Sequence, residues 1–313
     1  MRTNQHNNSS RGRNRNFKRN SNSESTENND RPQKRTSGPR VGKTNVFKSE
    51  SNKPYKAKTY NKPFDNGKKK TYREEPGSGP VRLNKYIANS GICSRREADT
   101  YITAGVVKVN GKIITELGYK VNPYDKVEFE GQIIKNEAKV YVVLNKPKDT
   151  ISAVTSDRGE STVVDIVSNC CNERIYPVGR LDKATTGVLL LTNDGDLTKK
   201  LTHPSKNIKK IYQVSLDKPL TKADMEKLAE GIVLEDGEIH ADEISYIDLD
   251  NKAKVGVELH SGRNRIVRRM FEHLGYRVKK LDRVYFAGIT KKNVPRGKWR
   301  FLSEKEIGFL KML

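Results

Sequence analysis

The sequence is poor in cysteine and has no long apolar run. Its three cysteines, Cys93, Cys170 and Cys171, are too few and too badly spaced for a zinc site, so we expect reduced thiols. A redox role for the adjacent pair is the less favoured alternative. No stretch approaches the roughly 20 apolar residues needed to cross a bilayer, and no apolar signal-peptide core lies near the N-terminus. We therefore expect a soluble, cytoplasmic protein that does not contact a membrane.

Acidic residues are also scarce relative to basic ones. Lysine and arginine total 61, aspartate and glutamate total 38, and the formal net charge is +23 with an isoelectric point near 9.8. This excess is far beyond what solubility alone requires. Neutralisation of phosphates with release of counterions is the natural use of so many cations, which indicates a nucleic-acid partner.

The first 80 residues lack the apolar content of a folded domain. They contain 20 lysines and arginines, 7 aspartates and glutamates and only 10 apolar residues. Such a composition cannot bury enough surface to offset chain entropy, so we expect residues 1–80 to be a disordered, basic, low-complexity arm. Two roles stay open: a solubilising tail, or an arm that gathers RNA through its cations and scattered aromatics. A transit peptide is disfavoured by the acidic residues at positions 24–30.

Residues 81–137 have the pattern of a small domain with two helices and a sheet. Leu83 and Ile87 lie on one helical face, and Gly91 supplies a stop. Ser94 and Glu97 form a capping box that fixes the start of the second helix. We expect that helix to end at Gly105 and to be followed by strands over 106–109, 112–114 and 126–129, with Asn110-Gly111 as a tight turn.

Residues 138–313 alternate apolar strands with a few helices, without regular βαβ order. This arrangement favours an α+β domain with a mixed, largely antiparallel sheet. The expected strands are 140–144, 188–192, 212–216, 255–259 and 285–289, and the expected helices are 197–202, 222–230 and 264–274.

Asp182 is the first candidate for chemistry. It lies in a turn after Gly179 and Arg180 and shortly before the run Val188 to Leu191, which has the composition of a strand buried on both faces. An acid held rigidly beside an arginine can act as a nucleophile. The structural alternative is an ordinary turn aspartate that bonds the backbone, and on residue type and position alone it is the more frequent case.

A second group of residues follows Gly262 and shifts this balance. The sequence there enters a helix with an apolar stripe, and at 100° per residue Arg265, Arg268 and Arg269 fall on the side opposite to it. Neighbouring like charges destabilise a helix, and only Glu272 is placed to relieve them. A polyanion or a buried carboxylate would relieve them better, although a solvated basic face is the plainer alternative.

Tyr212 is the third element, because it opens a strand next to Lys209 and Lys210. Its ring can stack on a base and its hydroxyl can bond or accept a proton, although packing is the usual role of a strand tyrosine. No serine, histidine and acid grouping, no phosphate loop and no metal spacing among the five histidines is present. We therefore expect a lone carboxylate that acts without metal or cofactor.

Over residues 81–302 the chain resembles the S4-domain-containing ribosomal RNA pseudouridine synthases of the RsuA and RluB types. The most specific motifs are Gly-Arg-Leu-Asp at 179–182, Thr186-Gly187 with the Leu-Leu-Thr-Asn-Asp-Gly that follows, Lys210 to Tyr212, and Gly-Arg-Asn-Arg at 262–265 running into Arg268-Arg269. Residues 81–137 look like the S4 RNA-binding domain, and residues 138–313 like the catalytic domain. One departure is Ile266, where many members carry Gln or Glu.

The resemblance implies an enzyme that converts one uridine of ribosomal RNA to pseudouridine, more in keeping with the large subunit than the small. It implies that Asp182 attacks a flipped-out uridine at C6 or C1′, that Tyr212 packs against the base, that Arg268 pairs with Asp182 and that Arg180 fills the gap left in the RNA. No metal or cofactor is implied, and we expect a monomer. A non-catalytic RNA-binding factor for ribosome assembly is the alternative from another class, and a small-subunit or transfer RNA target is the alternative within the enzyme class.

The resemblance also gives RNA contacts, on weaker grounds of residue type and motif placement. In the S4-like domain the expected contacts to phosphate are Arg82, Lys85, Arg95, Arg96 and Lys108. In the catalytic domain we expect RNA contacts from Arg263, Arg265 and Arg269. A separate RNA-binding domain would raise the effective concentration of substrate at the site.

Overall fold

The computed structural model of this chain describes residues 65–69 and 79–313. The expectation of a disordered arm over residues 1–80 therefore lies outside the described residues, apart from a few positions near its end. Among the described residues, no helix is long and apolar enough to cross a membrane.

The two-helix unit begins with the elements that the sequence indicates. Helix α1 (Leu83–Asn89) is followed by α2 (Arg95–Thr103), and the capping box is confirmed: Ser94 Oγ accepts from Glu97 N, and the Glu97 carboxylate accepts from Ser94 N. Their apolar faces share one core with Val107, Val109 and Val127. The strands are β2 (Val107–Val109), β3 (Lys112–Ile113), β5 (Val127–Phe129) and β6 (Gln132–Ile133) in the antiparallel order β3-β2-β5-β6, and β1 (Val81–Arg82) paired with β4 (Lys120–Val121).

The remainder of the described chain is built on a nine-stranded sheet of order β13-β14-β10-β15-β9-β7-β17, with β8 beside β9 and β16 beside β15. Within the described residues every pairing in this sheet is antiparallel except that of β9 with β15, which confirms the expected α+β fold. The strands are β7 (Tyr141–Lys146), β8 (Tyr176–Pro177), β9 (Thr186–Thr192), β10 (Lys210–Leu216), β13 (Glu243–Tyr246), β14 (Lys254–Leu259), β15 (Val278–Phe286), β16 (Ile289–Thr290) and β17 (Trp299–Phe301).

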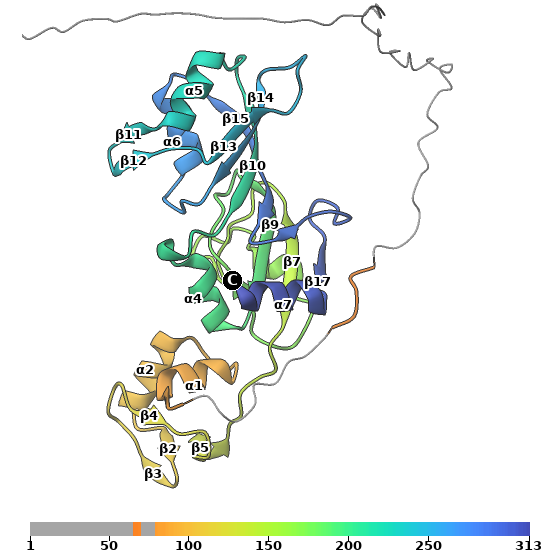
Figure 1. Ribbon diagram of the computed structural model, residues 1–313. Helices are drawn as coiled ribbons and strands as arrows, with labels where there is room; N and C mark the ends of the chain where they lie inside the picture. The colour runs from red at the N-terminus through yellow and green to blue at the C-terminus, as the bar shows by residue number, and fades with distance from the viewer. Residues whose placement is uncertain (1–64, 70–78) are drawn as a thin grey trace, which may run out of the picture. The chain divides into compact units, whose positions relative to one another are not determined.

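Both faces of the central strands are buried. Leu189 and Leu191 of β9 pack into one core cluster, whereas Val188 and Leu190 pack into the other. Figure 1 shows α5 (Lys222–Glu230) and α6 (Ile266–His273) beside the β10, β14 part of the sheet, and α4 (Gly195–Thr202) and α7 (Glu304–Met312) beside the β7, β9 part. The expectation of a strand buried on both faces after Asp182 is therefore confirmed.

Other expectations are confirmed in part. Helix α5 has the expected bounds, but the single strand expected over 285–289 is wrong: β15 ends at Phe286, and the chain turns at Ala287 and Gly288, both with positive φ, before β16. Helix α6 begins two residues later than expected because Arg265 adopts a left-handed conformation. The sequence did not predict α3 (Val163–Val167), α7, or the hairpin of β11 (Ile232–Leu234) and β12 (Gly237–Ile239).

The parallel pairing of β9 with β15 is short and joins the two parts of the large sheet. It places Thr186 opposite Asp282 and Gly187 opposite Arg283. Gly187 has a φ of +112°, and a Cβ added to it would lie 2.1 Å from the carbonyl oxygen and 2.6 Å from the amide nitrogen of Arg283. Only glycine lets the two backbones approach this closely.

Substitution of Gly187 by alanine should therefore separate the two strands. We expect Gly187→Ala to lower the free energy of unfolding by about 2–5 kcal/mol, from overpacking against backbone and from a disfavoured φ. The measurement is denaturant unfolding followed by circular dichroism. Gly308→Ala in α7 is the matched control, because an added Cβ there meets open space. Equal stability of the two variants would contradict the argument.

Candidate active site

The turn that carries Asp182 lies between β8 and β9 and is fixed by contacts from distant residues. Ser152 Oγ donates to the carbonyl oxygen of Leu181 at 3.0 Å and accepts from the Leu181 amide at 3.2 Å. The Thr185 amide donates to the carbonyl oxygen of Asp182 at 3.0 Å, which closes the turn. Leu181 is buried in the core, so the backbone on both sides of Asp182 is held in place.

The carboxylate of Asp182 is about one-third exposed and has two arginines beside it. Arg265 Nη1 lies 3.8 Å and Arg268 Nε 3.9 Å from Asp182 Oδ2. Both distances exceed that of a hydrogen bond, so the attraction is mainly that of nearby opposite charges. Arg265 is also close to Glu272, with 3.6 Å between Nη2 and Oε1.

The expectation that Arg265, Arg268 and Arg269 share the face opposite the apolar stripe is wrong for Arg268. Its side chain is buried on the inner side of α6, and its Nη1 donates to the carbonyl oxygen of Val278 at 2.9 Å. Burial lowers the pKa of Arg268, and Arg265 adds to this effect, whereas Asp182 opposes it. Arg268 is buried because α6 is covered by β15 as well as by the core beneath its apolar stripe, and a helical wheel contains no such neighbouring strand.

Arg263 and Arg269 are held by the β11–β12 hairpin. Nη1 and Nη2 of Arg269 both donate to the Asp236 carboxylate, at 2.8 and 2.7 Å. These bonds lower the pKa of Asp236 to about 2. Arg263 donates to the carbonyl oxygens of Gly237 and Glu238. Asp236 thus relieves the crowding of like charges that the sequence assigned to Glu272 alone.

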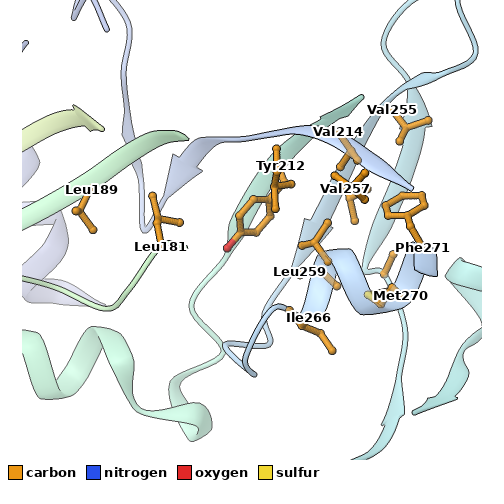
Figure 2. Packing of buried hydrophobic residues seen from close by; sticks show 14 of the residues in the cluster. Leu181, Leu189, Tyr212, Val214, Val255, Val257, Leu259, Ile266, Met270 and Phe271 are labelled. Carbon is orange, nitrogen blue, oxygen red and sulfur yellow. The ribbon is translucent and has the colours of Figure 1, made fainter. Parts of the chain in front are cut away.

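Tyr212 lies on β10 and is only 8% exposed. Figure 2 shows its ring between Leu181 on one side and Leu259 and Ile266 on the other. Arg283 lies opposite Tyr212 on the neighbouring strand β15, and the tyrosine side chain is next to its guanidinium group. The Tyr212 ring therefore has a fixed position in the wall of the site.

These side chains meet at a cavity of about 630 Å³. It is lined by five of the residues named from the sequence as RNA or catalytic contacts, together with the histidines of two loops. The cavity volume suits a single nucleotide-sized group. The lining includes Arg180, Asp182, Tyr212, His203, His260, Arg263 and Arg265.

Two cations of the cavity wall were not assigned a role from the sequence. Lys210 donates to the carbonyl oxygens of Ile208 and His260, and burial lowers its pKa to about 8, with Arg283 adding to the effect. Arg283 donates through Nε to the carbonyl oxygen of Val188. Its Nη2 is buried and has no hydrogen-bond partner among the described residues. Arg283 gave no sequence signal beyond an arginine within an apolar strand pattern.

The remaining predicted residues lie at the mouth of the cavity or on the two-helix unit. Arg180 is exposed at the mouth of the cavity. The five cations of the two-helix unit lie on its elements, where Arg82, Arg95, Arg96 and Lys108 are exposed and Lys85 is half-buried. Within the part of the chain that the structure describes, no group of three or more His, Cys, Asp or Glu residues is placed to hold a metal ion.

Comparison with known proteins agrees with this arrangement. A family model described as RNA pseudouridylate synthase matches residues 140–273, and the S4 domain model matches residues 81–127. The chain is 42% identical over 235 residues to the ribosomal large subunit pseudouridine synthase B of Bacillus subtilis (strain 168), which covers 74% of this chain and 96% of the relative. It is 40% identical over 238 residues to the dual-specificity RNA pseudouridine synthase RluF of Escherichia coli (strain K12), covering 72% and 77%.

A solved crystal structure of a pseudouridylate synthase is also similar, with a TM-score of 0.54 and 29% identity over 74% of this chain and 99% of that one. The fold and these matches define an RNA-modifying enzyme with an S4 domain. More narrowly, the chain belongs to the RNA pseudouridine synthase family, as the sequence motifs indicated.

The lowered pKa of Lys210 predicts how stability depends on pH. Its folded pKa of about 8 lies below the value of 10.5 in the unfolded chain, so between these pH values the unfolded state binds more protons. Stability from this group therefore rises with pH in that window and is lost as the pH falls through 8. We expect the wild type to gain unfolding free energy relative to Lys210→Met between pH 8 and 10.

The control for this titration is the neighbouring Lys209. Its pKa is raised by Glu258, so its contribution is fully present below pH 10.5 and changes little in the same window. Urea unfolding of both variants at several pH values measures the difference. A gap between wild type and Lys210→Met that stays constant with pH, as for Lys209→Met, would refute the prediction.

Proposed function

We propose that this enzyme converts one specific uridine of large-subunit ribosomal RNA to pseudouridine, with Asp182 as the nucleophile. The observation that carries the proposal is the Asp182 carboxylate, held on a rigid turn at the cavity with two arginines within 4 Å. The naming of a 42% identical relative as a large-subunit enzyme supports the choice of RNA.

In the proposed reaction a flipped-out uridine enters the cavity and the Asp182 carboxylate attacks it at C6 of the base or at C1′ of the ribose. The bond between N1 and C1′ breaks, the uracil turns, and C5 bonds to C1′. C5 loses a proton, N1 gains one, and Asp182 is released. Atoms are conserved within the nucleotide, so the residues need to hold and orient the base.

The other cavity residues have matching roles in this proposal. Tyr212 packs against the uracil ring from the wall of the cavity, and Arg268 stabilises the charge of Asp182 from its buried side. Arg180, exposed at the mouth, stacks in the RNA at the position that the uridine leaves. Arg263 and Arg265 line the cavity, and Arg269 lies on α6 bonded to Asp236; in the proposal all three contact RNA phosphates.

The proposal also divides the chain. Residues 81–137 form the RNA-binding domain, and residues 138–313 form the catalytic domain. The exposed cations of the first bind phosphate and bring substrate to the second. We propose that the residues that bind phosphate there are Arg82, Lys85, Arg95, Arg96 and Lys108.

The nucleophile is tested by complementation. Chemical mapping of pseudouridine should show one large-subunit site that is lost on deletion of the gene and restored by the wild type but not by Asp182→Asn. We expect the purified variant to lose at least about 10⁴-fold in rate, because no nucleophile remains. Its RNA affinity should stay within about threefold of wild type, because phosphate contacts dominate affinity.

The matched control is Asp149→Asn, an exposed carboxylate in a neighbouring loop, which should restore the site. Loss of no large-subunit site in the deletion strain would refute the choice of RNA. Normal modification by Asp182→Asn would refute the nucleophile. Normal ribosome assembly with Asp182→Ala but not with the deletion would favour a non-catalytic assembly role.

The role of the S4 domain is tested by salt dependence. Arg95→Ala with Arg96→Ala should weaken RNA binding and reduce the slope of log affinity against log salt by about 1–2, because up to two phosphate contacts are lost. The control is Lys222→Ala with Lys305→Ala, two exposed lysines of the catalytic domain. Filter binding at several salt concentrations measures both, and equal slopes would exclude the expected contacts.

A further inference from the structure

The proposed reaction moves a proton from C5 to N1 of the uracil and therefore needs a group that accepts and returns it. Asp182 serves as the nucleophile, and the arginines keep their protons at any physiological pH. A side chain that transfers a proton must lie within reach of it, and histidine supplies this function most often because imidazole changes protonation near neutral pH. The histidines of the cavity are therefore the candidates.

Two histidines line the cavity, His203 and His260, and they have different partners. His260 Nδ1 lies 2.7 Å from Asp242 Oδ2, whereas His203 Nδ1 lies 2.7 Å from the hydroxyl oxygen of Ser205. A carboxylate beside one ring nitrogen favours a proton there, and it stabilises the imidazolium that forms when the other nitrogen takes up a proton. His260 and Asp242 thus form the pair of a base and an orienting acid.

The sheet holds the backbone of both members of this pair. Strand β13 begins directly after Asp242, and β14 ends directly before His260. The two strands are antiparallel, and the Asp242 amide donates to the carbonyl oxygen of Glu258 at 3.0 Å. On the other edge of β14, Lys210 Nζ donates to the carbonyl oxygen of His260 at 2.8 Å. The His260 side chain itself is 34% exposed, so its ring stays accessible at a fixed position.

The loop that begins at His260 also reaches the nucleophile. Residues 260–265 connect β14 to α6, and Arg265 Nη1 at the end of this loop lies 3.8 Å from Asp182 Oδ2. His260, Arg265 and Asp182 line the same cavity. A nucleotide that fills the cavity therefore meets the carboxylate on one part of the wall and the imidazole on another.

Tyr212 is the other side chain of the cavity wall that can exchange a proton. Its ring is buried in the core, and its side chain is next to the Arg283 guanidinium. A phenol keeps its proton at neutral pH, so it accepts one less readily than an imidazole does. Packing against the base suits Tyr212 better than proton transfer.

We propose that His260, oriented by Asp242, is a catalytic residue that takes the proton from C5 of the uracil and returns it to N1. This inference rests on the proposed function of Asp182. The C5–H bond breaks, the proton bonds Nε2 of the neutral ring, and the electron pair re-forms the C5–C6 double bond. Where Asp182 is bonded to C6, this displaces its carboxylate; where it attacked C1′, the N1–C6 double bond returns its electron pair to N1. The imidazolium then gives the proton to N1, so the histidine ends in its starting form and no further reactant is consumed.

The test uses the full-length protein and unmodified large-subunit ribosomal RNA, transcribed with ordinary uridine or with uridine deuterated at C5. Single-turnover rates of pseudouridine formation are measured at saturating enzyme. We expect His260→Gln to lower the rate by about 10²-fold, the usual contribution of a general base. The ratio of the protium rate to the deuterium rate should exceed that of the wild type, because breaking the C5–H bond becomes the slow step. Asp242→Asn should raise this ratio with a smaller loss of rate.

His240→Gln is the matched control. His240 is exposed, its Nε2 lies 3.8 Å from the other oxygen of Asp242, and it does not line the cavity. This variant should match the wild type in both rate and isotope effect. A role of His260 in RNA binding or in the fold predicts a slower reaction whose isotope effect stays that of the wild type, because the steps before C5–H cleavage are then the ones slowed.

That outcome would overturn the inference, and so would equal rates of His260→Gln and wild type. An isotope effect raised by Tyr212→Phe but not by His260→Gln would assign the proton transfer to Tyr212 instead. Inactive wild-type enzyme would overturn the proposed function as well. Active wild type and inactive Asp182→Asn beside a fully active His260→Gln would overturn this inference alone.

Discussion

The pairing of β9 on both of its edges determines where the site forms. One edge is bonded to β7 from Gly187 to Thr192, whereas the other meets β8 near its end and β15 only at Thr186 and Gly187. The start of β9 is therefore the point at which the two parts of the large sheet join. Asp182 lies four residues before this point, and Tyr212 lies two strands away in the same row. Proximity of the two follows from sheet register.

Charge at the site is arranged in separate pairs. Asp236 forms a hydrogen-bonded ion pair with Arg269 and lies close to Arg263, so the hairpin that carries Asp236 is bound to the arginine-rich segment around the start of α6. Asp182 faces Arg265 and Arg268 at the same end of that helix. The two carboxylates thus each hold a different pair of arginines in this segment. A strongly basic chain can place four arginines close together in this way because each has a defined neighbour.

The sequence predicted local structure better than contacts between distant segments. The bounds of α5 follow from Thr221, whose side chain caps the first turn, and from Gly231, which ends the helix, so neighbouring residues suffice. The burial of Arg268 depends on Val278 of β15, which no helical wheel contains. The sequence found Asp182 but not the support of its turn, because Ser152 lies 30 residues away in the chain.

The contacts of Asp182 differ in kind from those of Asp236, and the difference suits the role of nucleophile that we propose for Asp182. Arg269 holds the Asp236 carboxylate with two short hydrogen bonds, which fix both oxygens. The Asp182 carboxylate has its arginines at 3.8 and 3.9 Å, while its backbone is held by short bonds. A carboxylate that forms a covalent bond must present a free lone pair, and breaking a bidentate pair would add to the barrier. A tightly held backbone with a loosely paired carboxylate combines a fixed position with reactive oxygens.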